Sequence, residues 1–168
     1  MTVPENGTVS GRTPVSPYLS GSVTESPVGL VLSEHAGKRN AMTVSFFSEV
    51  SHHPTSLWVS IAKSSLTHAM IIASGQFSLI VLHERQATIA VLCGAVSGRS
   101  ADKCSSLPLS VKDGWLFLDG ALASIACTVM SMRDLGDHTL FLAAIISGEL
   151  DSRNSMRRHL LTLDLMRA

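Results

Sequence analysis

The chain has 168 residues and a mass of 17.9 kDa, the size of one domain of common length. Hydrophobic residues make up 45% and charged residues 15%, which excludes a disordered chain and predicts apolar surface buried between subunits. Thirteen basic and thirteen acidic residues cancel, so nucleic acid is not expected as a partner.

Residues 1–20 are expected to form a flexible tail, and residues 21–168 one domain whose first part holds three strands and a helix. A short apolar run is typical of a buried strand, and alternation of apolar and polar residues is typical of a half-buried one. Apolar spacing of three and four residues predicts a helix instead. In chain order, the patterns predict strand Val28–Leu32, the polar turn Glu34–Asn40, strands Ala41–Ser48 and Ser56–Ala62, and helix Ser64–Ser74, which Gly75 ends.

In the second part of the domain, the sequence pattern predicts one more short helix and several strands. In chain order, the elements are strand Phe77–Leu82, helix Gln86–Gly94, the polar loop Val96–Ser106, and strands Trp115–Leu118, Ala123–Met132 and Thr139–Ile146. The alternating leucines of His159–Met166 fit either a final strand or a short amphipathic helix. Many short strands with regular turn signals favour a mainly β barrel.

The cysteines and the apolar runs of the sequence indicate the cellular location of the protein. Cys93, Cys104 and Cys127 are odd in number and form no CxxC, so we expect free thiols and no structural zinc. The N-terminus lacks the apolar run of a secretory signal, and runs such as Leu140–Ile146 are too short to span a bilayer. We therefore expect a soluble, cytoplasmic protein with no membrane partner.

The motifs of several common enzyme classes are absent from the sequence. There is no GxGxxG after a strand, no GxxxxGK[ST] loop, no GxSxG and no HExxH. His52 and His53 are adjacent, so on a strand they face opposite sides and do not share one ion. We expect a solvated turn there and no metal site.

Four segments in a fixed order carry a more specific signal. They are Arg39–Ser48, Ser60–His68 with Ser74–Phe77, Ser97–Lys103, and Gly136–Phe141. Together they resemble the flavin reductase-like family, and the resemblance runs from about Val28 to Ile146. It implies a mainly β, Greek-key split β-barrel with short helices between strands. It also implies a homodimer that binds FMN or FAD near the subunit interface and uses NADH or NADPH as co-substrate.

The resemblance further implies the residues that bind each ligand. Extended backbone amides and a threonine hydroxyl suit the polar edge of the isoalloxazine, while serine hydroxyls at a helix start suit a phosphate. The implied flavin-binding residues are Asn40, Ala41, Met42, Thr43, Ser45, Ala62, Lys63, Ser64, Ser65, Thr67 and Lys103. Cys104, Asp137 and His138 would lie at the nicotinamide. His138 is the catalytic candidate, and it would position the nicotinamide or its phosphates rather than remove a proton.

Each of these residues also has an ordinary structural explanation. The segment from Asn40 to Ser45 fits a buried strand whose hydrogen bonds are all made within a sheet. One serine near Ser65 fits a plain helix cap, although a cap does not account for the whole hydroxyl cluster. Lys103 fits an exposed lysine, and Asp137 with His138 fits a polar turn that faces solvent.

The expected activity is hydride transfer from C4 of NADH or NADPH to N5 of the flavin, with reduced flavin supplied to a partner monooxygenase. Two positions depart from the family pattern: Ile80 replaces an asparagine and Cys104 replaces a phenylalanine. These departures leave two alternatives open. One is a non-enzymatic FMN-binding electron carrier that serves a redox protein, and the other is a split barrel that has lost its flavin.

Overall fold

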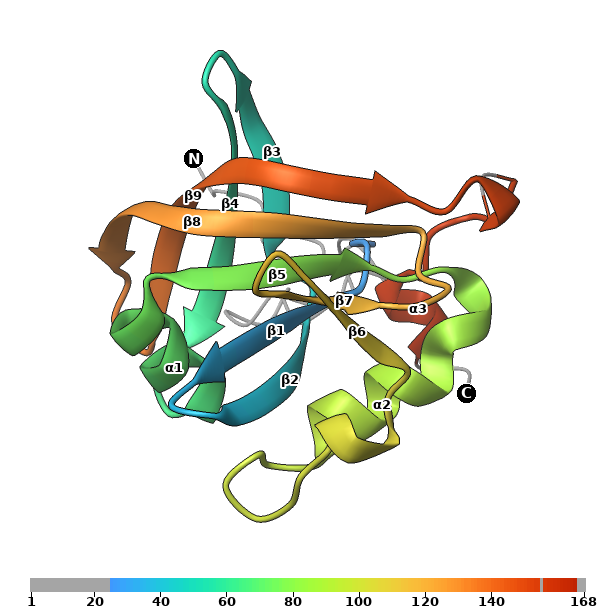
Figure 1. The fold of residues 1–168 in the computed structure, drawn as a ribbon, viewed down its shortest axis with the longest axis horizontal. Coiled ribbons are helices and arrows are strands. Elements are labelled where there is room, and N and C mark those ends of the chain that lie inside the picture. The colour runs from blue at the N-terminus through green and yellow to red at the C-terminus, as the bar shows by residue number, and fades with distance from the viewer. Residues whose placement is uncertain (1–24, 155, 166–168) are drawn as a thin grey trace, which may run out of the picture.

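Figure 1 shows the fold in a computed structural model, which describes residues 25–154 and 156–165. The predicted tail at residues 1–20 lies outside this range. The described chain is mainly β with short helices between strands, as predicted. The strands are β1 Gly29–His35, β2 Lys38–Val44, β3 Phe47–His52, β4 Thr55–Ala62, β5 Gln76–Val81, β6 Leu109–Lys112, β7 Trp115–Leu118, β8 Ala123–Asp134 and β9 His138–Leu150. The α-helices are α1 Leu66–Ser74, α2 Ala87–Ala95 and α3 Thr162–Leu165.

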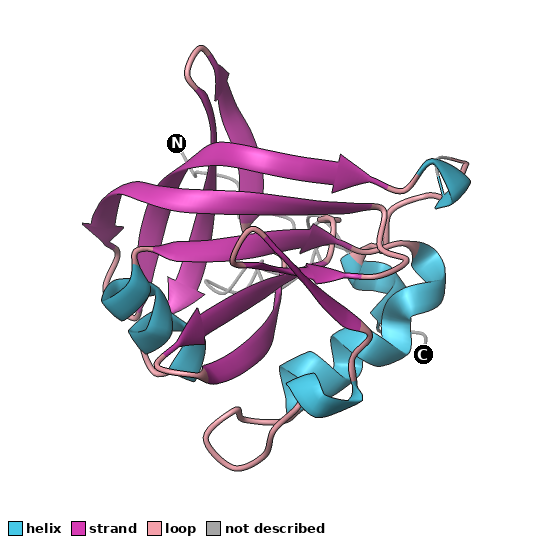
Figure 2. Cartoon of the chain, viewed as in Figure 1, coloured by secondary structure: helices cyan, strands magenta, loops and turns pink. Residues whose placement is uncertain are grey.

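One curled sheet forms most of the fold, with strand order β2-β1-β5-β8-β9-β4-β3 (Figure 1, Figure 2). Its two edge strands, β2 and β3, are consecutive in the chain and are joined by only Ser45 and Phe46. The backbone N–H of Ser60 donates to the carbonyl of Phe46 at 2.9 Å, which ties this corner to β4. Because so short a connection joins the two edges, the sheet must curl round on itself like a barrel.

Apolar side chains gather on both faces of this sheet. Alternate residues of β1 point to opposite faces, and both sets are buried, which explains its unbroken apolar run. One cluster lies under β4, β9 and α1 and includes Val31, Val59, Ile61, Ile71, Phe77 and Phe141. The other lies under α2 and the β6–β7 hairpin and includes Leu30, Leu32, Ile80, Ala90, Cys93 and Leu116. The two clusters fix α1 and α2 against β1 and β2.

The structure corrects two predictions in the first part of the domain. The polar turn Glu34–Asn40 shrinks to Ala36 and Gly37, both with positive φ, and the residues on either side continue β1 and β2. The single predicted strand Ala41–Ser48 is two strands, because the chain turns the barrel corner after Val44. Asn40 therefore lies within a strand rather than in a turn.

The second part also differs in detail from the predictions. Strand β6, with its short alternation of Leu109 and Val111, was not predicted. Strand β8 begins at Ala123 as predicted but runs on to Asp134, strand β9 is longer than predicted at both ends, and the helix expected to end at Gly94 runs to Ala95. The C-terminal ambiguity resolves to the four-residue helix α3, preceded by an isolated bridge between Pro27 and Leu161.

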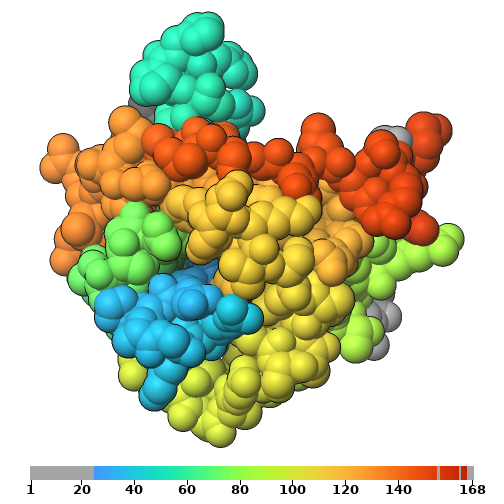
Figure 3. All heavy atoms as spheres, in the orientation of Figure 1, coloured from blue at the N-terminus to red at the C-terminus, as the bar shows by residue number. Residues whose placement is uncertain are grey.

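The β3–β4 hairpin projects beyond the rest of the surface (Figure 3). It carries exposed Val50, and exposed Phe46 lies at its base. No helix in the described part of the chain is long and apolar enough to cross a bilayer.

The close packing of β1 against β5 generates a stability prediction. A Cβ added at Gly29 would lie 2.5 Å from the carbonyl oxygen of Ile80, and neither strand can move without breaking the sheet. We expect Gly29→Ala to lower the free energy of unfolding by about 2 kcal/mol or more, measured by urea denaturation. Gly94→Ala is the matched control, because its Cβ meets only Thr43, at 3.4 Å, and alanine favours the helix. Equal midpoints for the two variants would contradict the described packing.

Candidate functional site

A buried hydrogen bond joins β2 to the start of α1. Asn40 is 4% exposed, and its Nδ2 donates to Oγ1 of the fully buried Thr67 at 2.7 Å. The loop after α2 closes over this pair, because a Cβ at Gly98 would overlap Oδ1 of Asn40. Three segments that are far apart in the sequence therefore meet at one junction, and two of the predicted flavin-binding residues form it.

The predicted phosphate-binding hydroxyls lie at the start of α1. Ser65 caps the helix, with its Oγ accepting from the backbone N–H of His68 at 3.1 Å. Ser64 is exposed just before it. The first-turn N–H groups of a helix have no partner within the helix, so this end offers donors to an anion.

The predicted nicotinamide residues lie at the adjoining ends of β4 and β9. Ala62 pairs with His138 across these strands, and the backbone N–H of Lys63 donates to the carbonyl of Asp137 at 2.9 Å. The imidazole Nδ1 of His138 lies 2.9 Å from the Asp137 carboxylate. That hydrogen bond and the adjacent imidazole lower the pKa of Asp137.

Two aromatic contacts hold this corner in place. The ring of Phe46 packs edge-on to His138, with 6.4 Å between centroids. One turn into α1, Nε2 of His68 lies 2.9 Å from Oγ1 of Thr139, and its ring packs edge-on to Phe141. Burial, and then the charge of Lys63, lower the pKa of His68. His68 therefore favours the neutral state and acts as a tie between α1 and β9.

Lys63 and Lys103, the two predicted lysines, have different surroundings. Lys63 is exposed, and its ammonium pairs with the Asp134 carboxylate at 2.6 Å. Lys103 is buried and makes no ion pair with any of the described residues. Its Nζ is buried and donates to the carbonyls of Cys93 and Val96 at 2.8 and 2.7 Å, so it caps the C-terminal end of α2.

The other predicted flavin-binding residues follow β2 into the barrel corner. Ala41 is fully buried in the cluster under α2, and Met42 packs against the other cluster. The Thr43 hydroxyl donates to the carbonyl of Ala90 at 2.5 Å, so its oxygen is left to accept but its proton is used. Ser45 is half-buried at the corner. Among these residues, Thr43 and Ala41 have clear structural roles.

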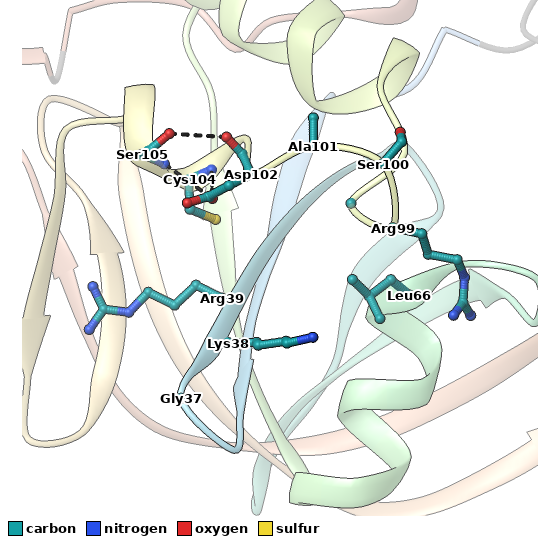
Figure 4. A pocket seen from close by; sticks show the side chains of 11 residues that line it. Gly37, Lys38, Arg39, Leu66, Arg99, Ser100, Ala101, Asp102, Cys104 and Ser105 are labelled. Carbon is teal, nitrogen blue, oxygen red and sulfur yellow. Dashed lines mark hydrogen bonds between the residues drawn. The ribbon is translucent and has the colours of Figure 1, made fainter.

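A cleft of about 610 Å³ opens beside the junction (Figure 4). The β1–β2 turn, the first residue of α1 and the loop after α2 form its walls. Its lining includes Lys38, Arg39, Leu66, Arg99, Asp102 and Cys104. Burial, and then the Asp102 carboxylate, raise the pKa of the Cys104 thiol to about 11, so this thiol stays neutral.

The residues present fit a flavin. Among the strands of the described residues, β2 pairs with β1 alone, so its outer edge leaves main-chain N–H and C=O groups for a ligand. Near that edge lie the α1 hydroxyls and the neutral thiol of Cys104. The departure at Ile80 is accommodated in the core, because Ile80 is fully buried in the cluster under α2. Within the described residues, no three His, Cys, Asp or Glu side chains gather as a metal site would require.

Sequence reasoning missed Lys38, Arg99 and Phe46. Lys38 and Arg99 belong to a predicted turn and a predicted loop, and nothing in the local pattern shows that these segments share a cleft. Phe46 appeared to be an interior strand residue, but it is half-exposed at the corner beside His138.

Comparisons with known proteins agree with this geometry. A family model described as Flavin reductase like domain matches residues 21–164. The NADH-dependent flavin reductase StyB of Pseudomonas fluorescens is 32% identical over 109 residues. That alignment covers 65% of this chain and 62% of the relative, which is less than two thirds of the relative's length.

Solved structures confirm the split-barrel fold. The nitrilotriacetate monooxygenase component B homologue from Mycobacterium thermoresistibile superposes with a TM-score of 0.75 and 27% identity, covering 82% of this chain and 75% of that one. The NADH:FAD oxidoreductase SgcE6 of Streptomyces globisporus superposes with a TM-score of 0.75 and 22% identity, covering 82% and 81%.

The junction between β2 and α1 generates a second prediction. Thr67→Val keeps the shape of the side chain but leaves the buried Asn40 amide without its acceptor, which costs about 1–3 kcal/mol of stability. Asn40→Leu combined with Thr67→Val removes both partners. We expect this double variant to lose less stability in urea than the sum of the two single variants. Strict additivity would show that the hydrogen bond does not form in solution.

Proposed function

The chain belongs to the flavin reductase-like family, and from this premise we propose that it is an NAD(P)H-dependent flavin reductase. The observation that carries the proposal is the junction of Asn40, Thr67 and Gly98 beside the cleft. There an edge strand, a helix start that carries serine hydroxyls and the neutral thiol of Cys104 lie together, as a flavin ring with a phosphate tail requires.

A bound flavin supplies the acceptor for a hydride, which carries two electrons and one proton from C4 of the nicotinamide to N5. The chain's own residues orient the two rings, and such positioning supplies most of the catalysis. Asn40, Met42 and Ser45 along β2 would hold the isoalloxazine edge, and Ser64 and Ser65 would hold the phosphate. His138 is fixed by Asp137 and Phe46, so its ring is poised to position the nicotinamide without taking a proton.

The destination of the electrons is also part of the proposal. The name of the Mycobacterium relative describes a monooxygenase component, which supports delivery of reduced flavin to a partner oxygenase. Residues 25–154 and 156–165 hold three free thiols, all buried, which supports a reducing, cytoplasmic setting. NADH is the first reductant to test, because the StyB relative is named for it.

The proposed activity is tested by an anaerobic absorption spectrum of the purified protein with FMN, taken before and after NADH and then NADPH. We expect the visible band of oxidised flavin to disappear with at least one nucleotide. If flavin binds but neither nucleotide bleaches it, the protein is an electron carrier rather than a reductase. A protein that binds neither FMN nor FAD would overturn both.

The position of His138 generates a kinetic prediction. We expect His138→Ala to raise KM for NADH about tenfold while KM for FMN stays within about twofold, since the ring is placed to hold the nicotinamide. His159→Ala removes an exposed imidazole elsewhere in the chain and serves as the control. An equal rise in both KM values would remove the assigned role.

We also propose that the protein is a homodimer. Exposed apolar side chains occur at the barrel corner, on the β3–β4 hairpin, and in the C-terminal half of β8 and just after it, namely Phe46, Val50, Met130, Met132 and Leu135. Since Phe46 contacts His138, a partner seated there would complete the wall of the site.

Light scattering after size exclusion tests the dimer. We expect the wild-type chain to elute at twice its 17.9 kDa mass, and the Met130→Lys, Met132→Lys double variant to elute as a monomer. Val91→Lys, at an exposed apolar position on α2, should stay dimeric. A monomeric wild-type protein would exclude the proposed assembly.

A further inference from the structure

The cleft beside the junction is positively charged although the chain as a whole has no net charge. Three cations line it, Lys38, Arg39 and Arg99, against one carboxylate, Asp102. Because the Cys104 thiol stays protonated, it adds no negative charge. The charge in this cleft is therefore local and favours an anion.

Two of the four charged groups are already used by the fold. Arg39 Nε donates to Oε2 of Glu34 at 2.8 Å, and in Figure 4 its side chain points away from Leu66. Oδ1 of Asp102 accepts from the backbone N–H groups of Cys104 and Ser105, at 2.9 and 3.3 Å. The Arg39 guanidinium is therefore paired with the Glu34 carboxylate, and the Asp102 carboxylate is held by the backbone of its own loop.

Lys38 and Arg99 remain available. Neither side chain has an ion-pair or hydrogen-bond partner among residues 25–154 and 156–165. They come from opposite walls, the start of β2 and the loop after α2, and their charged ends lie on either side of Leu66 in Figure 4. Two unpaired cations that line one concave surface from separate segments are typical of a phosphate site.

This cleft is separate from the hydroxyls assigned to the flavin phosphate. Leu66 is the only residue of α1 that lines it, and neither Ser64 nor Ser65 does. The cleft therefore offers an anion position lined by other residues than the Ser64 and Ser65 hydroxyls. FMN has one phosphate, FAD and NADH have two, and NADPH has a third on its adenosine ribose.

We propose that Lys38 and Arg99 bind a phosphate of an adenine dinucleotide, whose adenylate half occupies this cleft. The proposal rests on the proposed function, because it assigns the α1 hydroxyls to the flavin's own phosphate. A volume of about 610 Å³ suits half of a dinucleotide. FAD and NAD(P)H both carry this half, so the shared chemistry is an adenosine diphosphate group.

The test compares wild-type protein with Lys38→Gln, Arg99→Gln and the double variant, and with Arg85→Gln as an exposed arginine outside the cleft. Calorimetry measures the Kd of ADP, FMN and FAD, and kinetics with FMN as acceptor measure KM for NADH and NADPH. We expect the double variant to weaken ADP about tenfold while the Kd of FMN stays within about twofold. Arg85→Gln should match wild type in every measurement.

The measurements with FAD, NADH and NADPH show which molecule supplies the adenylate. A matching loss for FAD assigns the cleft to the flavin, and a matching rise in KM for NADH or NADPH assigns it to the reductant. Unchanged ADP affinity, or ADP weakened with FAD, NADH and NADPH all unchanged, would overturn the proposal. FMN weakened as much as ADP would also overturn it, because the cleft would then hold the flavin's single phosphate.

Failure of the adenylate-site proposal can be told apart from failure of the proposed reductase function. Wild-type protein that binds ADP through Lys38 and Arg99 but binds no flavin would leave the cleft assigned and remove the reductase. Wild-type protein that reduces FMN but does not bind ADP would do the reverse.

Discussion

The site depends on one buried hydrogen bond, from Asn40 of β2 to Thr67 of α1. Since Asn40 is 4% exposed, its amide cannot turn to water when the bond breaks. Gly98 packs directly on the same amide, so the loop after α2 depends on it too. An edge strand, a helix start and a loop are thereby fixed at one point. The groups on β2, at the start of α1 and in the loop after α2 are placed relative to that point.

The parts of the fold that the sequence predicts are those whose signal is local. Strand β4 alternates Leu57, Val59 and Ile61, and α1 ends at Gly75, so both follow from residues next to one another. The barrel corner does not. Its break after Val44 depends on the backbone N–H of Ser60, which reaches Phe46 from another strand. A pattern confined to Ala41–Ser48 contains no record of that contact.

Lys103 shows the same limit within the site. The sequence left it either facing a phosphate or exposed to solvent, but its ammonium is buried against two carbonyls at the end of α2. Burial lowers the pKa of Lys103, and the carbonyl dipoles at the helix end compensate for the lost water. The free cations of the site are instead Lys38 and Arg99, in segments whose polar composition predicted only loops. Which basic side chains face a ligand is therefore decided by tertiary contacts, and the local sequence motif does not reveal it.

The two departures from the family pattern have different physical consequences. Ile80 is fully buried among apolar neighbours, so it changes packing under α2 and leaves the surface of the site unaltered. Cys104 lines the cleft, where a thiol occupies less volume than a phenyl ring. Its raised pKa, about 11, keeps it neutral beside Lys38 and Arg99. The substitution therefore adds room without cancelling the positive charge of the cleft. In the proposed reaction, β2 and His138 would hold the rings in position for hydride transfer, and this enlarged, cationic cleft would select the nucleotide.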